Sequence, residues 1–226
     1  MHSKGFIERD LASLLSAPKI PQRLPKHISA DEAIALLRFL EKELSAATGP
    51  APHLDPSISP DLISLVLIAL LYGGGLRVSE ACGLETKNLN WSKNTCLVRG
   101  KGSKERLVAL PAFTMSTLKA MLEKQKSLHA GHPTRYVFGE DPLSPRRAYE
   151  LVRKAGLRAG LLKPLHPHAL RHSYATHLLR SGANLRVLQA LLGHSSLQAT
   201  SRYTHVGLDE LARTLESHSP LKTRKA

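Results

Sequence analysis

Hydrophobic residues recur at the three-to-four-residue spacing of an amphipathic helix along much of the chain. The first such stretch begins at Ser29, where Glu32 follows three residues later as a capping box and apolar residues continue to Leu44. A second stretch begins at Asp61 and is apolar on nearly every side until the glycines at 73–75 stop it. A helix without a polar face belongs in the interior of a domain, so this stretch predicts a buried central helix.

The second half of the chain carries further helical patterns, bounded by capping residues and glycines. Ser144 followed by Pro145 is a helix start, because a serine caps the first turn and a proline fits its first position. Gly182 and Gly193 are stop signals for two other patterns. The helices predicted in this half are 112–128, 144–159, 168–180, 184–193, a helix from 195 or 196 to 203, and 208–217.

Two short runs of β-type residues, 95–99 and 105–110, are joined through Gly-Lys-Gly-Ser at 100–103, which is a hairpin signature. Residues 136–138 are too few to assign as a strand. The pattern therefore predicts a mainly α fold with a small antiparallel β-sheet, in the α+β class.

Proline-rich segments lie outside these elements. Residues 1–27 contain three prolines that hold the chain extended, so we interpret them as a linker or the end of a preceding domain. Residues 46–60 contain four prolines and a glycine and form a long loop for a compact domain. The last six residues, 221–226, are a basic tail that we expect to be frayed.

The composition narrows the class of protein. The chain has 226 residues with 32 Lys and Arg against 18 Asp and Glu, a net charge of +14. Such a basic surface favours a polyanionic partner, most commonly nucleic acid, although a basic protein that is only well solubilised would look the same. Two cysteines, Cys82 and Cys96, exclude a disulfide scaffold and favour a reducing compartment. The longest apolar run, 62–72, is too short to span a bilayer, and the first residues lack the apolar block of a signal peptide.

The strongest candidate for chemistry is the pair His168 and Arg171, three residues apart at a predicted helix start. This spacing places the imidazole and the guanidinium on one face, where an arginine can bind a phosphate through two parallel hydrogen bonds. Taken alone, the pair fits equally a surface histidine beside a solvated arginine.

Five further residues are candidates of the same kind. Arg77 follows the buried helix with Glu80 one turn later, Lys101 lies at the hairpin tip, and His194 precedes Tyr203 by nine residues. Each has an ordinary interpretation as well: a surface ion pair, a solubilising lysine, and a tyrosine that anchors a helix end.

Taken together and in this order, these residues resemble the tyrosine recombinase (phage integrase) family, and most closely its bacterial Xer branch. Six separated positions hold the residue type that the family uses for catalysis. The matching segments are RLPKHIS at 23–29, GGLRVSEACGL at 74–84, GKGSKERLVALP at 100–111, and the long segment 166–206, which contains HALRHS and LLGH.

The resemblance implies a role for each catalytic position. Tyr203 would attack the scissile phosphate, Lys101 would protonate the departing 5′ oxygen, and His168 would assist proton movement at the tyrosine. The product would be a 3′-phosphotyrosyl link that retains the energy of the phosphodiester bond, so strand exchange would need neither ATP nor a metal or other cofactor.

The same resemblance assigns the phosphate-binding groups. Arg77, Arg171 and His194 would bind the non-bridging oxygens, and Glu80 would hold Arg77 in place. These roles agree with general chemistry, because phosphoryl transfer needs positive donors where equatorial charge develops.

The implied protein is a bacterial site-specific DNA recombinase for chromosome or plasmid dimer resolution. Two alternatives stay open: a mobile-element integrase of the same family, and a non-enzymatic DNA-binding protein on this scaffold. The expected partners are a double-stranded recombination site, a second recombinase subunit in a tetrameric synapse and a DNA translocase activator, with no membrane. The expected location is the cytoplasm, at the nucleoid.

The expected organisation follows the family. Residues 1–27 would be a linker or remnant of an N-terminal core-binding domain, 28–206 the catalytic domain, and 207–226 a C-terminal helix and basic tail. The apolar stripe Leu208, Leu211 and Leu215 would dock either on its own domain or on a neighbouring subunit.

Two rival enzymes are considered. A metal nuclease would use the histidines that crowd one helix start, but acidic or cysteine ligands are lacking nearby apart from Glu80. The histidines in question are His166, His168, His172 and His177. A type IB topoisomerase shares the same catalytic residue types, and the LLGHSS motif favours a recombinase over it.

Overall fold

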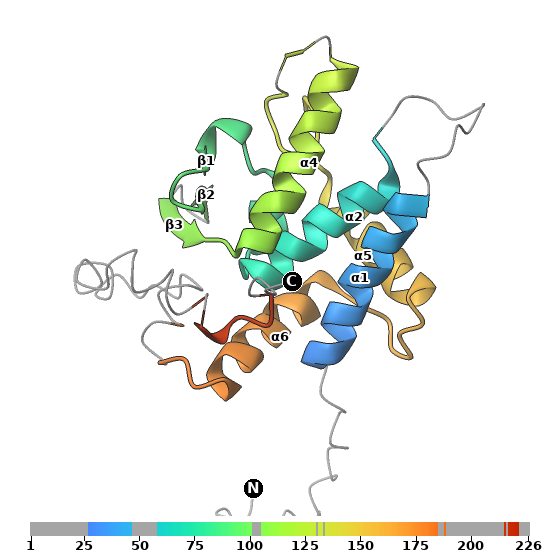
Figure 1. The fold of residues 1–226 in the computed structure, drawn as a ribbon, viewed down its shortest axis with the longest axis vertical. Coiled ribbons are helices and arrows are strands. Elements are labelled where there is room, and N and C mark those ends of the chain that lie inside the picture. Colours follow the sequence, from blue (N-terminus) through green and yellow to red (C-terminus); the bar gives the residue numbers. More distant parts are fainter. Residues whose placement is uncertain are drawn as a thin grey trace, which may run out of the picture.

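Helices surround a buried central helix, and a small sheet lies at one side of them (Figure 1). The structure is a computed structural model that describes residues 27–46, 58–100, 105–129, 131–132, 134–184, 188, 215 and 217–221. The predicted terminal segment before residue 27 and most of the predicted 46–60 loop lie outside these residues, as do most of the helices predicted after residue 184. In the described part, the predicted mainly α fold with a small antiparallel sheet is confirmed.

Helix α1 (Ala30–Ala46) begins with the capping box that the sequence predicts. The Ser29 backbone N–H donates to Glu32 Oε2 at 2.7 Å, and the Glu32 N–H donates to Ser29 Oγ at 3.1 Å. These two bonds satisfy N–H groups that the first helical turn leaves without partners. The apolar face of α1, which includes Leu36 and Leu40, is buried against α2.

Helix α2 (Pro60–Ile68) is the buried central helix, and it begins one residue earlier than predicted. Ser59 is the cap, because its hydroxyl accepts from the Asp61 N–H at 3.1 Å and a proline fits the first helical position. The chain continues into a wider π-helical turn, η3 (Ala69–Gly73), whose residues are all buried. The core helix therefore ends deep inside the protein, and residues 74–76 connect it to Arg77.

A short helix, α3 (Val78–Cys82), follows and was not predicted as a separate element. After a 3₁₀ turn, η4 (Thr86–Asn88), comes an antiparallel sheet of order β1-β2-β3. Strands β2 (Thr95–Arg99) and β3 (Glu105–Ala109) form the predicted hairpin, with Arg99 opposite Glu105. The two-residue strand β1 (Leu89–Asn90) carries no readable alternation, so the sequence did not predict it.

Three longer helices complete the described fold: α4 (Ala112–Leu128), α5 (Pro145–Arg158) and α6 (Pro167–Arg180). Their bounds agree with the predicted ranges to within a residue. The Ser144 hydroxyl caps α5 by accepting from the Arg147 N–H at 3.2 Å. Helices α4 and α5 pack against α2, and α6 packs against η3. Helix α6, which carries His168 and Arg171, thus lies against the element that leads to Arg77.

The described C-terminal residues pack on the same chain. Leu215 and Leu221 are buried in the core, and the Ser181 hydroxyl donates to the His218 carbonyl at 3.0 Å. Leu208 and Leu211 of the predicted stripe lie outside the described residues. Within the described part, no helix is both long and apolar enough to cross a membrane.

Candidate active site

Glu80 is a fully buried carboxylate at the centre of the candidate site. It lies on α3, and its side chain is only 1% exposed. A buried charge is stable only when other groups pair with it and satisfy its lone pairs. Three arginines from different parts of the chain lie around its two oxygens, which are therefore well supplied with donors.

Arg77 is the first of these arginines and precedes α3 as its N-cap residue. Its Nη1 donates to Glu80 Oε1 at 2.9 Å, and its backbone N–H donates to Oε2 at 2.7 Å. The side chain of Arg77 is 42% exposed, so it remains accessible to solvent although Glu80 holds one of its terminal nitrogens. The contact on which the predicted role of Glu80 depends is therefore present in the structure.

Arg106 is the second arginine, and the sequence analysis did not single it out. It reaches Glu80 from β3, with Nη1 donating to Oε1 and Nη2 donating to Oε2 at 3.0 Å. The sequence did contain a signal for it. Side chains alternate between the two faces of a strand, so Arg106 lies on the same inward face as the buried Val108. A charged residue on the core side of a strand needs a buried partner, and Glu80 provides one.

Arg171 is the third arginine and comes from α6, one turn after His168. Its Nη1 donates to the carbonyl oxygen of Gly75 and lies 3.9 Å from Glu80 Oε2. The structure thus brings Arg171 together with Arg77 and Glu80, although 91 residues separate Glu80 from Arg171 in the sequence. With 13% of its side chain exposed, Arg171 is the more enclosed of the two predicted phosphate-binding arginines.

The charges of this cluster shift the pKa values of its members. Burial alone would raise the pKa of Glu80, but hydrogen bonds from Arg106 and the Arg77 backbone outweigh it and hold the pKa below its usual 4.5. Burial is the main cause that lowers the pKa of Arg171 to about 10, and the positive charge of Arg77 is the second. Glu80 is therefore anionic and Arg171 cationic at neutral pH. Three guanidinium groups against one carboxylate leave an excess of positive charge, which suits an anion.

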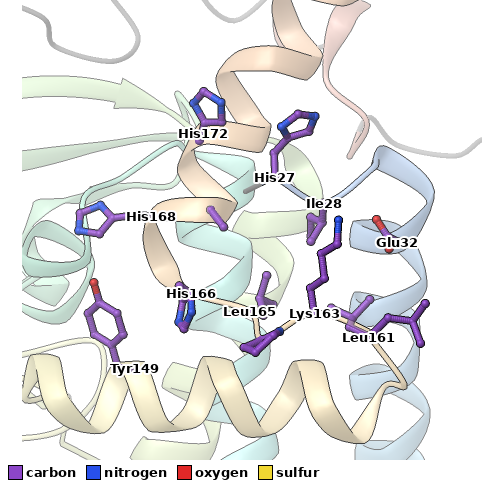
Figure 2. A pocket seen from close by; sticks show the side chains of 13 residues that line it. His27, Ile28, Glu32, Tyr149, Leu161, Lys163, Leu165, His166, His168 and His172 are labelled. Carbon is purple, nitrogen blue, oxygen red and sulfur yellow. The ribbon is translucent and has the colours of Figure 1, made fainter. Parts of the chain in front are cut away.

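His168 is exposed at the start of α6 and borders a groove of about 1160 Å³ between α1, α5 and α6. Figure 2 shows Tyr149 extending from α5 toward the ring of His168, and the two ring centroids lie 6.4 Å apart. His166 and His172 line the same groove. His168 is thus on the side of α6 that solvent or a large ligand can reach.

Lys101, His194 and Tyr203 lie outside the described residues, so their predicted positions in the site stay predictions. The strand ends on either side of Lys101 are described. Arg99 Nη2 lies 3.1 Å from Glu105 Oε1, and this pair closes the described part of the hairpin.

The four histidines of the metal-nuclease hypothesis do not form a metal cluster in the described part of the chain. His177 lies away from the groove and is bound to Tyr72, whose hydroxyl is 2.8 Å from its Nδ1. Cys82 and Cys96 are free and buried, and burial raises the pKa of the Cys96 thiol to about 12. They are inert core residues in this environment.

Comparisons with known proteins agree with the motifs. The phage integrase family matches residues 28–209. The tyrosine recombinase XerC of Myxococcus xanthus is 37% identical over an alignment of 216 residues that covers 92% of this chain and 67% of that protein. The tyrosine recombinase XerD of Corynebacterium glutamicum is 34% identical, covering 96% of this chain and 69% of that protein.

Solved structures give the same result. The crystal structure of XerA recombinase has a TM-score of 0.62 and 26% identity, covering 87% of this chain and 65% of that one. The XerH site-specific recombinase bound to its difH substrate has a TM-score of 0.59 and 29% identity, and this chain covers 54% of it. The chain therefore spans less than two thirds of these solved chains. The predicted fold, Xer kinship and enzyme class are confirmed, and the chain belongs to the phage integrase family of tyrosine recombinases.

Proposed function

We propose that this chain cleaves and rejoins DNA at a specific site through a covalent link between Tyr203 and a 3′ phosphate. The observation that carries the proposal is the buried Glu80 carboxylate with Arg77 and Arg171 beside it. This arrangement holds two guanidinium groups close together, and each stays partly exposed. A phosphate between them would be bound by planar, permanently charged donors that suit its oxygens.

The reaction needs little from the protein besides position and charge. As the phenol oxygen of Tyr203 attacks phosphorus, negative charge grows on the non-bridging oxygens, and Arg77 and Arg171 stabilise it. Because Glu80 fixes Arg77 beforehand, the site need not reorganise when that charge appears. His194 would act with the two arginines as a further donor.

The proton balance involves the remaining predicted residues. The phenol of Tyr203 loses its proton as the oxygen–phosphorus bond forms, and His168 assists that transfer. The bond between phosphorus and the 5′ oxygen breaks, and Lys101 supplies a proton to that oxygen. Rejoining runs the same steps in reverse, with a 5′ hydroxyl attacking the phosphotyrosine, so no ATP is consumed.

The partners and organisation belong to the same proposal. A double-stranded recombination site is the substrate, as the difH site is for the XerH relative. A second recombinase subunit in a tetrameric synapse and a DNA translocase activator are the further partners, and the cytoplasm with its nucleoid is the location. Residues 1–27 would be a linker, 28–206 the catalytic domain, and 207–226 the C-terminal helix and tail.

A covalent-adduct assay tests the function. The protein is incubated in EDTA with a nicked suicide substrate carrying the recombination site, and products are separated on a denaturing gel. We expect a slow, protease-sensitive DNA band with the wild type and with Tyr136→Phe, a control on another tyrosine. Tyr203→Phe should bind DNA and give no such band. A band from Tyr203→Phe would overturn the assignment of the nucleophile.

The same assay separates two of the rivals, and relaxation of supercoiled DNA separates the third, which would also form an adduct. A metal nuclease would give no cleavage in EDTA, and a non-enzymatic binding protein would shift the DNA without an adduct. A type IB topoisomerase would relax supercoiled DNA without pairing two sites.

A further inference from the structure

Arg106 contacts Glu80 more extensively than any other arginine described in the site. Its two terminal nitrogens bind the two carboxylate oxygens in a fork, whereas Arg77 uses one terminal nitrogen and its backbone. A bidentate pair fixes the plane of a carboxylate as well as its position. The plane of Glu80 in turn decides where the Nη1 of Arg77 lies, because both arginines donate to the same oxygen, Oε1.

The surroundings of Arg106 favour support of the site over direct contact with a ligand. Its side chain is 17% exposed, close to the 13% of Arg171, so what sets it apart from Arg171 is how its nitrogens are used. Its Nε is buried and has no hydrogen-bond partner among the described residues. Both of its terminal nitrogens already bind Glu80, so a phosphate at the surface would compete with a buried carboxylate for them.

Arg106 connects two parts of the fold that are distant in the sequence. It lies on β3 opposite Val98 of β2, in a hairpin whose strands pair along their described length. Glu80 lies on α3, 26 residues earlier in the sequence. The fork is therefore a cross-link between the sheet and the helix that follows Arg77.

We propose that Arg106 is a positioning residue of the recombinase site, which acts through Glu80 to hold Arg77 and Arg171 in the geometry that binds the scissile phosphate. This inference rests on the proposed function. Arg106 itself does not touch the DNA. Without it, Glu80 would lose its bidentate partner, and Arg77 would lose the fixed carboxylate that orients it. Arg171 would keep only its bond to the Gly75 carbonyl as a described hydrogen bond.

The first experiment compares variants in the adduct assay at single turnover. Arg106→Met should lower the cleavage rate about 30-fold, less than the loss expected for deleting a direct donor, while DNA affinity stays within about 3-fold. Arg106→Lys keeps the charge but cannot form the bidentate pair, so its cleavage rate should lie between those of the wild type and Arg106→Met. Arg146→Met is the control: it removes an arginine of α5 whose ion pair with Glu150 is exposed, and its cleavage rate should match the wild type.

The second experiment asks whether the loss passes through the phosphate-binding arginines. A methylphosphonate at the scissile position removes a non-bridging charge. Because less negative charge then has to be stabilised, misplaced arginines should lower the cleavage rate by a smaller factor on this substrate. On this substrate the deficit of Arg106→Met should shrink to about 3-fold. In a Glu80→Gln background, where the carboxylate charge is already gone, Arg106→Met should add less than about 2-fold.

Other outcomes overturn the inference. Recovery only on a 5′-thio substrate would assign Arg106 to leaving-group protonation, and a matching loss of DNA affinity would make it a DNA contact. Arg106 would have only a structural role if Arg106→Met cleaved all substrates with the same deficit and if its melting temperature fell both alone and in the Glu80→Gln background. If the wild type forms no adduct, the proposed function fails and the inference with it. If the wild type forms the adduct and the Arg106 variants cleave as fast as it does, the inference alone fails.

Discussion

Gly75 and Tyr174 lie so close that a side chain at position 75 has no room. A Cβ built on Gly75 would come within 2.4 Å of Cε1 of Tyr174, and the backbone there has a φ of +61°. The carbonyl of Gly75 also accepts the hydrogen bond from Arg171. The chain before Arg77 and the helix that carries Arg171 are therefore joined at a position where only glycine fits in both backbone and space.

Gly75→Ala should accordingly lower both stability and cleavage. Overpacking against a buried ring and a left-handed backbone each cost on the order of 1–2 kcal/mol, so we expect a loss of about 2–4 kcal/mol in the free energy of unfolding. Gly160→Ala is the control, because its φ is +77° and nothing lies within 4 Å of the added methyl. Urea unfolding measures both variants, and equal losses would show that the contact with Tyr174 contributes nothing.

Removing Arg171 should impair chemistry more than folding. Arg171→Ala should lower cleavage by about 10²-fold or more, the usual scale for deleting a donor to developing negative charge. Arg171→Lys should recover only part of the rate, because the planar fork is lost. The adduct assay decides this, with Arg180→Ala on the exposed end of the same helix as the control. Cleavage by Arg171→Ala within a few-fold of the wild type would remove Arg171 from the site.

The proposed acid role of Lys101 has a chemical signature. Sulfur in place of the scissile 5′ oxygen makes a leaving group that needs no proton, so Lys101→Ala should regain most of its rate on that substrate. Tyr203→Phe should stay inactive on both substrates. Rates are compared on paired oxygen and sulfur substrates of one sequence, and an equal deficit on both would mean that Lys101 only binds DNA.

The depressed pKa of Glu80 predicts the acid limit of stability. Since its pKa in the folded protein lies below 4.5, the unfolded chain binds a proton first as the pH falls. The stability that Glu80 contributes is thus present above pH 4.5 and is lost as the pH falls through its lower folded value. The wild type should lose stability more steeply than Glu80→Gln in this window, as measured by urea unfolding at a series of pH values. Parallel curves would show that Glu80 is not ionised in the folded state.

Local chemistry let the sequence determine most of the described helices. Two helix caps are recognisable from the sequence: Ser29 with Glu32, and Ser144 before Pro145. Their hydrogen bonds join groups only three residues apart, so both partners can be identified without the fold. The all-round apolar pattern after Asp61 likewise identified the buried helix. Arg77 and Glu80 were found for the same reason, since a separation of three residues brings them together on one turn.

Only the tertiary structure decided which residues that are distant in the sequence contact one another. Nothing in the sequence around Arg106 states that its partner is Glu80, because that contact depends on how β3 packs against α3. The meeting of Arg171 with Gly75 likewise depends on α6 packing against η3. A buried carboxylate must find its donors wherever the fold brings them, so the sequence determined which groups are present, and the packing of distant elements determined which of them share one site.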